Sequence, residues 1–315
     1  MFVSPTGTFD NGAEISIYHL MSYLQKNGYK VVNVAPKSTM NNQTDYMKRF
    51  SDIGIDVHLI PTIKWWWEDA PGGIAGLPEQ RAASFRDSIN QIIHIINAYH
   101  VDFVITNTVN MYEGMVAAAC TEIPHYTLIH EFPEGEFAYY LDKIDFVEEN
   151  SDRIFSVDGQ LKNVLTQKFV NSDVGGFTPY TELKTSVLKK GNQHRIVSVG
   201  RLTERKNQLE LLYAFQKLTS NSMYKDIELV FIGPWDSEYK KLCDSYINEY
   251  NLRNIIFCGE QKNPWSLVTD KDICVFPSAL ETYGLVYVES ILNGIPTIFS
   301  DNPGHLSAYQ RFEFG

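Results

Sequence analysis

The sequence has 315 residues, of which 44% are hydrophobic and 21% are charged. This length predicts two domains, and this composition is that of a globular protein rather than a disordered one. The net charge of −11 lies mostly in the first half, because residues 1–150 carry −10 and residues 151–315 carry −1. An acidic surface repels nucleic acid and anionic lipid, so the sequence predicts no nucleic-acid partner.

The cysteines and the absence of targeting patterns indicate a compartment. The four cysteines form no C-x-x-C pair, and three of them lie in or beside apolar runs. Buried free thiols are therefore expected rather than disulfides or metal ligands, which favours the reducing cytoplasm. No stretch has the roughly 18–20 apolar residues of a membrane span, and the N-terminus has no signal-peptide pattern. We expect a cytoplasmic protein without a transmembrane segment, which leaves peripheral attachment to a membrane open.

Short apolar runs alternate with helical patterns along the first part of the chain. Strands are predicted in FVSP, KVVNVAP, DVHLIP, VDFVITN, HYTLIHE and RIFSVD. Between the first two runs, Ile17, Leu20, Met21 and Leu24 predict the core stripe of a helix that Gly28 ends. Apolar strands separated by helices indicate a parallel sheet covered on both faces. The sequence therefore predicts an α/β, Rossmann-like domain over residues 1–170.

The second part of the chain repeats this organisation after a change of composition. Residues 171–193 contain glycines and a proline without periodicity, and are predicted to be a linker. Strands are then predicted in RIVSVGR, IELVFIG, NIIFCG, DICVFP and PTIFS, within a second domain over residues 194–315. Two such domains would face each other across a cleft at the carboxyl ends of their strands. Because the chain stops soon after the last strand, we expect the second domain to be incomplete at its C-terminus.

The most informative stretch is 276–304. A predicted strand is followed by a loop from Glu281 to Gly284 and by a helix over Leu285–Asn293. A helix N-terminus offers free N–H groups and a positive dipole end, so a phosphate is expected at Thr282, Tyr283, Gly284 and Leu285. Glu281 and Glu289 would lie roughly 12 Å apart along a helix, too far to act as one carboxylate pair.

A second stretch, residues 198–208, carries two cations at a strand-to-helix turn. Arg201 and Lys206 follow the predicted strand end at Gly200. Arginine donates two hydrogen bonds at once and lysine acts as a point charge, so this pair suits a pyrophosphate. The alternative interpretation is a solvated, basic start of a helix. The presence of the 276–304 stretch in the same chain makes this alternative less favourable.

Together these motifs resemble retaining glycosyltransferases of family four, which have the GT-B fold of two facing Rossmann-like domains. The resemblance spans nearly the whole chain. Its most specific element is the pair Glu281 and Glu289, seven residues between them, followed by Gly294-Ile295-Pro296. The turn from Gly200 to Lys206 is the usual companion of that motif in the family.

The resemblance implies a role for each of these residues. Arg201 and Lys206 would hold the diphosphate of a nucleotide sugar, and the backbone from Tyr283 to Leu285 would add donors. Glu289 would bind the ribose hydroxyls, and Glu281 would face the donor sugar. By analogy of position, the base would lie near Gly259.

The first domain carries two weaker matches. Residues 10–14 resemble the family turn Gly-Gly-Ala-Glu, in which Gly12 would approach the donor phosphate. Asn11 replaces the first glycine, and asparagine tolerates left-handed dihedrals. His130 ends a predicted strand; a lone histidine is more often structural, but a strand end at the cleft favours a place beside the reacting sugar.

The sequence thus predicts a glycosyltransferase that moves a sugar from a nucleotide-diphosphate donor to a glycan, protein or lipid head group, with retention. No cofactor and no essential metal are expected, because the two cations take the metal's place, and Asp270 and Asp272 alone make an incomplete metal site. A nucleotide-sugar epimerase and a catalytically silent module stay open; Ser307, where the family has a glutamate, favours the silent module. The run Trp65-Trp66-Trp67 is expected to pack beneath a loop, with acceptor contact as the minority reading.

Overall fold

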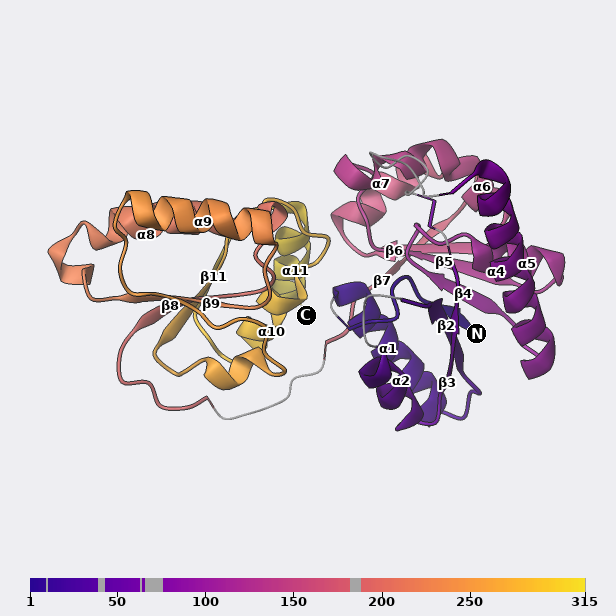
Figure 1. The fold of residues 1–315 in the computed structure, drawn as a ribbon, viewed down its shortest axis with the longest axis horizontal. Helices are drawn as coiled ribbons and strands as arrows, with labels where there is room; N and C mark the ends of the chain where they lie inside the picture. The colour runs from indigo at the N-terminus through magenta and orange to yellow at the C-terminus, as the bar shows by residue number, and fades with distance from the viewer. Residues whose placement is uncertain (10, 39–42, 63, 66–75, 182–187, 315) are drawn as a thin grey trace. The chain divides into compact units, whose positions relative to one another are not determined.

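The computed structural model describes residues 1–9, 11–38, 43–62, 64–65, 76–181 and 188–314. The chain divides into two compact units, Met1–Thr181 and Glu182–Gly315 (Figure 1). Each unit is built on one parallel sheet with helices on both faces, as the sequence predicts.

The sheet of the first unit has the strand order β3-β2-β1-β4-β5-β6-β7, and every neighbouring pair is parallel. Its strands are β1 (Phe2–Val3), β2 (Val32–Pro36), β3 (Asp56–Ile60), β4 (Val104–Asn107), β5 (His125–Ile129), β6 (Arg153–Val157) and β7 (Val174–Phe177). Its helices are α1 (Gly12–Lys26), α2 (Thr44–Ser51), α4 (Pro78–Tyr99), α5 (Glu113–Cys120), α6 (Ile144–Glu149), α7 (Gln160–Lys168) and the 3₁₀ helix η1 (Gly135–Lys143).

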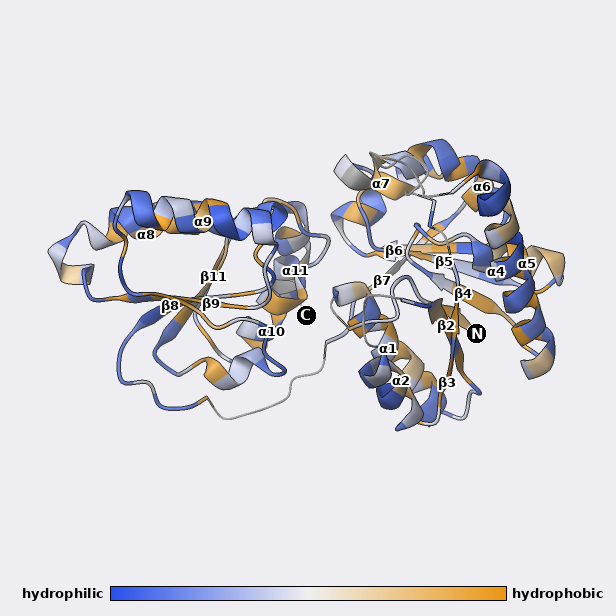
Figure 2. Cartoon of the chain, in the orientation of Figure 1, coloured by the Kyte–Doolittle hydropathy of each residue, from blue (hydrophilic) through white to orange (hydrophobic). Residues whose placement is uncertain are grey.

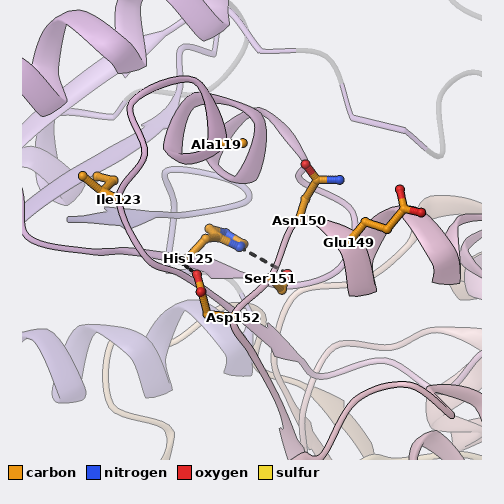
Figure 3. A pocket seen from close by; sticks show the side chains of 7 residues that line it. All are labelled: Ala119, Ile123, His125, Glu149, Asn150, Ser151 and Asp152. Carbon is orange, nitrogen blue, oxygen red and sulfur yellow. Dashed lines mark hydrogen bonds between the residues drawn. The ribbon is translucent and has the colours of Figure 1, made fainter.

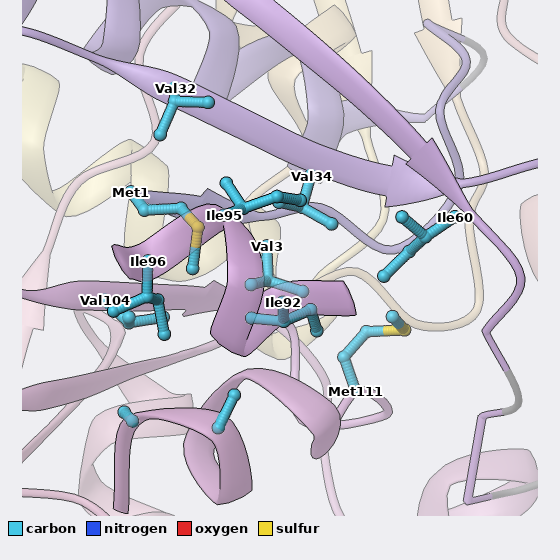
Figure 4. Packing of buried hydrophobic residues seen from close by; sticks show 12 residues of the cluster. Met1, Val3, Val32, Val34, Ile60, Ile92, Ile95, Ile96, Val104 and Met111 are labelled. Carbon is cyan, nitrogen blue, oxygen red and sulfur yellow. The ribbon is translucent and has the colours of Figure 1, made fainter. Parts of the chain in front are cut away.

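Two hydrophobic clusters hold this unit together, one on each face of the sheet. Successive residues of a strand point to opposite faces, so Phe2 packs with α1 and α2 while Val3 packs with α4 and α5. Figure 4 shows the second cluster, in which Ile92, Ile95 and Ile96 of α4 meet Val3 and the neighbouring strands. The apolar, β-branched strands are therefore buried on both sides.

The first unit extends further than predicted. Residues 174–177 were expected in the linker but form β7, and the unit ends at Thr181. Gly175 and Gly176 were expected to be linker residues, but in the structure they allow close packing. A Cβ added at Gly175 would lie 2.6 Å from Phe155 Cδ1, and one at Gly176 would lie 2.7 Å from Asp158 Oδ1.

The second unit has a five-stranded parallel sheet of order β10-β9-β8-β11-β12. Its strands are β8 (Arg195–Val199), β9 (Glu228–Ile232), β10 (Ile255–Phe257), β11 (Asp272–Phe276) and β12 (Thr297–Phe299). Its helices are α8 (Gln208–Thr219), α9 (Ser237–Glu249), α10 (Leu285–Leu292) and α11 (Pro303–Phe314), with 3₁₀ helices η2 (Glu204–Lys206), η3 (Ser222–Tyr224) and η4 (Pro264–Leu267).

Helices also cover both faces of the second sheet. On one face, α8 and α9 alternate apolar and polar positions, and their apolar residues pack against Leu229 and Phe231 of β9 (Figure 2). On the other, Tyr287 of α10 packs on Phe299 of β12, with ring centroids 4.4 Å apart. Each unit therefore buries its own core.

The predicted core stripe of α1 is wrong at one position. Ile17 and Met21 are buried, but Leu20 is 38% exposed. All four cysteines are free; Cys243 and Cys274 are buried as expected, whereas Cys258 is half-buried and Cys120 is exposed. Within the described residues, we find no helix long and apolar enough to cross a bilayer.

Candidate active site

The carboxyl edge of the second unit's sheet gathers the predicted phosphate-binding residues. The turns after β8 and β9 begin at Gly200 and Gly233, and they touch: a Cβ added at Gly233 would lie 2.2 Å from Gly200 O. Gly233 also has a φ of +149°. Only glycine fits there, and its presence brings the loops of neighbouring strands together.

A cation cluster lies over the end of β11. Lys206 Nζ and Arg205 Nη1 both bind the Glu281 carboxylate, the arginine at 3.0 Å. The Ala279 N–H donates to Arg205 O at 2.9 Å, which ties the two loops together. A small hollow beside this cluster is lined by Ser198, Val199, Lys206, Gln208, Phe276, Pro277, Ser278 and Val286.

The cations that meet at Glu281 differ from the predicted pair. Arg201 and Lys206 were expected on either side of a turn, with a helix beginning near residue 206. Instead residues 204–206 form η2, and Asn207 with a φ of +56° separates that turn from α8. Arg205 therefore points toward Glu281 beside Lys206. Its position in the sequence did not indicate this contact. Arg201 begins the same turn, with an exposed side chain.

Glu281 is charged in this setting. Burial alone would raise the pKa of its carboxyl, but Lys206 and Arg205 outweigh it and lower the pKa to about 2. A carboxylate buried beside two cations holds both of them in place. The expected contact of Glu281 with a donor sugar stays a prediction, because its oxygens bind Lys206 and Arg205 in the free protein.

The helix N-terminus lies where it was predicted. α10 begins at Leu285, and Gly284 is its N-cap with a φ of +80°. Glycine brings no side chain, so no side-chain cap occupies the first-turn N–H groups. These N–H groups and the positive end of the helix dipole suit an anion. Thr282 and Tyr283 precede Gly284 in the same loop.

Glu289 lies within α10 and has a different partner from Glu281. Trp265 Nε1 donates to Glu289 Oε2 at 2.8 Å. The two glutamates are therefore separate sites, as their spacing predicts. Trp265 went unnoticed in the sequence because it belongs to η4, far from the motif along the chain.

Gly259 lies at the same edge, after β10. Its φ is +67°, and its carbonyl accepts the Gly233 N–H at 2.9 Å. The ring of Trp235 lies 3.9 Å from where a Cβ at Gly259 would be, and this side chain is 42% exposed. The structure thus places an accessible aromatic ring beside Gly259 that the sequence analysis missed.

In the first unit, Gly12 opens α1. Asn11 is the N-cap in an extended conformation, with a φ of −139°, and its Oδ1 accepts the Glu14 N–H at 3.0 Å. Asn11 therefore makes no use of the left-handed dihedrals that asparagine tolerates, because its side chain caps the helix instead. Asp10, the first residue of this turn, lies outside the described residues.

His130 follows β5 and is joined to α1 through Asn107 at the end of β4. Its Nε2 lies 2.8 Å from Asn107 Oδ1, and Asn107 Nδ2 donates to Ala13 O at 3.3 Å. Because the amide nitrogen is used toward Ala13, the proton of this contact lies on Nε2. Burial lowers the pKa of His130 to about 4, so the ring is neutral near pH 7. Asn107 completes this group and was not predicted.

Two other residues of the first unit have clear surroundings. Glu131 accepts the His130 N–H at 3.0 Å, and burial raises the pKa of its carboxyl to about 7. Trp65 is buried and stacks on Tyr112, with ring centroids 4.9 Å apart. Trp65 therefore packs against other side chains, which was the default expectation. Trp66 and Trp67 lie outside the described residues.

A hollow of about 190 Å³ lies at the opposite, amino edge of the first sheet (Figure 3). Its polar groups already bond to one another: His125 Nδ1 lies 3.2 Å from Ser151 Oγ, and the His125 N–H donates to Asp152 Oδ2 at 2.8 Å. It contains none of the predicted site residues. We interpret it as a structural feature where β5 and β6 begin.

Asp270 and Asp272, which alone would make an incomplete metal site, form ion pairs with basic side chains of the protein. Asp270 pairs with Lys190 at 2.8 Å and Asp272 with Arg195 at 2.7 Å. In the part of the chain that the structure describes, no group of three or more His, Cys, Asp or Glu residues is arranged to hold a metal ion.

Comparison with known proteins identifies the family of the second unit. Residues 180–313 match the family Glycosyl transferases group 1. This match covers the second unit. The second unit is a glycosyl transferases group 1 domain. The site just described, from Gly200 to Glu289, lies within this group 1 domain.

Curated relatives match over part of their length. An uncharacterized glycosyltransferase of Methanocaldococcus jannaschii is 32% identical over 106 residues, which are 33% of this chain and 25% of that protein. The capsular polysaccharide biosynthesis glycosyltransferase CapH of Staphylococcus aureus is 34% identical over 93 residues, 29% of this chain and 26% of CapH. The matched stretches thus span about a quarter of these relatives.

Solved structures match the whole fold. The Anabaena protein HepE, crystallised with UDP and glucose, has a TM-score of 0.72 at 16% identity, over 97% of this chain and 82% of HepE. The lipopolysaccharide outer core galactosyltransferase WaaB has a TM-score of 0.64 at 15% identity, over 96% of this chain and 81% of WaaB. The two parallel-sheet units therefore have the GT-B architecture expected from the sequence.

Proposed function

We propose that this chain is a retaining glycosyltransferase that takes a sugar from a nucleotide-diphosphate donor, and that the group 1 domain binds the donor. One observation carries the proposal: Glu281, which binds Lys206, lies in the loop that runs directly into the uncapped N-terminus of α10. Cations and a helix N-terminus within one loop system suit a diphosphate.

The chemistry of transfer needs charge stabilisation above all. The bond from the anomeric carbon to the donor phosphate oxygen breaks, and a bond to an acceptor hydroxyl oxygen forms on the same face. The acceptor proton passes to an oxygen of the leaving diphosphate. Lys206, Arg205, Arg201 and the first-turn N–H groups of α10 would hold the negative charge that develops on the leaving group. Glu281 would keep Lys206 and Arg205 oriented for this task.

The remaining predicted residues take supporting roles in this proposal. Glu289 would bind the ribose hydroxyls while it keeps Trp265 in place, and Gly259 would lie next to the base. In the first unit, Gly12 and His130 would approach the donor, with His130 as a neutral hydrogen-bonding group because of its lowered pKa. The acceptor is a neutral glycan, protein or lipid head group in the proposal, since the first 150 residues are strongly acidic.

A thermal-shift screen tests the proposal. The probes are UDP-glucose, UDP-N-acetylglucosamine, GDP-mannose and ADP-glucose, with UDP-glucose first because HepE was crystallised with UDP and glucose. A ligand at 100 times its dissociation constant stabilises a protein by about 2.7 kcal/mol, so one probe is expected to raise the melting temperature clearly. No shift with any of the four would contradict donor binding and would favour the silent module.

Replacing Trp235 with alanine is expected to weaken binding of the preferred nucleotide sugar by about 1–3 kcal/mol, roughly 5- to 150-fold. The reason is that an exposed ring beside Gly259 can stack on the base. Calorimetric titration measures the change. Tyr250→Ala is the matched control, because Tyr250 is similarly exposed, at 45%, in the same unit. Equal affinity of the Trp235 variant and the wild type would remove Trp235 from the base site.

The silent module has one observation in its favour. Ser307, at the position of a family glutamate, lies in α11 and donates from Oγ to Pro303 O at 2.7 Å. Its hydroxyl is therefore engaged within its own helix. Release of nucleoside diphosphate during incubation with each of the four probes separates the two candidates, since a silent module would release none.

A further inference from the structure

His305 is a buried histidine behind the proposed phosphate site. It lies in the first turn of α11 and is 1% exposed. Its ring packs on Tyr287 and Phe299, with centroid distances of 5.1 and 5.7 Å. Neither the sequence motifs nor the proposed function gives it a role.

The tautomer of the neutral His305 ring is assigned from its hydrogen bonds. Ring Nδ1 lies 3.1 Å from Ser300 O, which can only accept, and 2.9 Å from Asn302 Nδ2, which can only donate. Asn302 Oδ1 accepts the His305 N–H at 3.0 Å, and both Asn302 amide hydrogens have other acceptors, Ser278 O and Ser300 Oγ. We therefore assign the ring proton to Nδ1, which donates to Ser300 O. Nε2 then has a lone pair, and none of the described residues forms a hydrogen bond with it.

The free ring nitrogen faces the start of α10. A Cβ added at Gly284 would lie 2.9 Å from His305 Nε2 and 2.6 Å from Cδ2. The loop before Gly284 also rests on the start of α11, since a Cβ at Gly304 would lie 2.3 Å from Glu281 O. A buried nitrogen with a lone pair therefore lies directly behind the helix N-terminus where a diphosphate is proposed to bind.

We propose that His305 is a proton-linked positioning residue of the diphosphate site: Nε2 takes up a proton from solvent when a nucleotide sugar binds at the N-terminus of α10. The imidazolium then adds a positive charge behind the phosphates. This inference rests on the proposed function. It concerns how binding depends on pH, and it assigns His305 no contact with the reacting atoms.

The surroundings of His305 set the direction of this coupling. In the free protein, burial lowers its pKa most, the Ser300 carbonyl and the Glu281 carboxylate raise it, and Lys206 lowers it slightly. The ring is therefore neutral near pH 7. A diphosphate adds two negative charges on the Gly284 side, and nearby negative charge favours the protonated ring. Tyr287 on α10 and Tyr309 on α11 are phenols, uncharged near neutrality, and Asp301 is exposed in the preceding segment.

Proton uptake and ligand binding strengthen each other by thermodynamic linkage. Donor affinity is therefore expected to rise as the pH falls through the window between the pKa of His305 in the complex and its lower pKa in the free protein. Within that window one proton changes the affinity by up to about tenfold per pH unit. Above the window the affinity is constant.

Isothermal titration calorimetry on the full chain tests the proposal. The nucleotide sugar that stabilises the protein most in the four-probe screen is titrated between pH 6 and 8, in two buffers that differ in ionisation enthalpy. Its diphosphate is esterified at both ends, so the ligand itself neither gains nor loses a proton in this range. The wild type is expected to take up a fraction of a proton, up to one. His305→Gln should take up none and lose the pH dependence, while His194→Gln, an exposed control in the same unit, should behave as the wild type.

The outcomes separate this inference from the proposed function. If the wild type binds the donor without proton uptake, or if His305→Gln keeps the uptake, the inference is wrong while donor binding stands. If no probe binds the wild type, the proposed function fails and the inference fails with it. Should His305→Gln not fold, carbon and nitrogen NMR shifts of the His305 ring in the wild type decide. A neutral Nδ1–H ring in both free and bound protein would overturn the proposal.

Discussion

Replacing Lys206 with alanine is expected to lower nucleoside-diphosphate release from the preferred donor by about two to three orders of magnitude. Lys206 is one of the cations that Glu281 holds at the start of the α10 loop. The charge that develops on the leaving diphosphate would lose this partner, while the binding of base and ribose would remain. The loss should therefore lie mainly in kcat, as measured by steady-state kinetics.

A matched control separates this effect from general loss of a lysine. Lys240 has the same side-chain exposure as Lys206, 17%, and also pairs with a carboxylate, Asp244. Lys240→Ala is expected to keep a near-normal kcat, and because Lys240 Nζ lies 5.7 Å from the centroid of the Trp235 ring, any effect of this variant on donor binding should be confined to KM. Near-normal turnover of Lys206→Ala itself would remove Lys206 from the diphosphate site.

Stability must be followed in parallel, because Lys206→Ala leaves Glu281 buried with only Arg205. Removing one partner of a buried ion pair costs about 3–5 kcal/mol when nothing replaces it. Arg205 remains 3.0 Å from the carboxylate, so we expect a smaller loss. The double variant Lys206→Ala/Glu281→Gln removes the buried carboxylate charge that Arg205 alone would balance, and it should recover stability without recovering turnover.

Replacing Gly284 with alanine is expected to destabilise the protein and to abolish donor binding. The backbone there has a φ of +80°, where a residue with a Cβ is strained by about 1–2 kcal/mol. The new Cβ would also meet the His305 ring at 2.6 Å, and such overpacking costs about 1–3 kcal/mol more. Chemical denaturation measures the stability, and calorimetry measures the binding.

Gly294 provides the control at the other end of α10. Its φ is +72°, but a Cβ there would meet nothing within 4 Å. Gly294→Ala is therefore expected to lose only the stability that the strained backbone conformation costs, and to bind the donor normally. Adding His305→Ala to Gly284→Ala should recover the part of the stability that the clash removes. Equal losses for Gly284→Ala and Gly294→Ala would contradict the contact between Gly284 and His305.

The sequence predicted the sheets well because the signals are local. Eleven of the described strands coincide with apolar, β-branched runs that can be recognised without the rest of the chain. β7 was missed because Gly175 and Gly176 were interpreted as linker residues. Their lack of a side chain serves contacts with Phe155 and Asp158, which lie far from them in sequence. The close contacts that require a glycine can thus often be recognised only in the folded structure.

The site was predictable where its motif is continuous and was missed where it depends on pairing across the fold. Gly284 and the start of α10 follow from one run of residues. Arg205 did not, since its role rests on a 3₁₀ turn that directs it toward Glu281, 76 residues away in sequence. The role proposed for His305 could not be predicted from the sequence either, because its ring faces Gly284 only through the packing of α11 against the Gly284 loop.

A backbone amide NMR titration of the full chain with the preferred nucleotide sugar tests most directly whether the donor binds at the start of α10. We expect the largest chemical-shift changes at residues 200–206, 282–286 and 303–305, around the cation cluster and the two helix starts. Changes that concentrate instead at the amino edge of the first sheet, around His125 and Ser151, would contradict it. So would a donor that binds without moving the amides of Gly284 and Leu285.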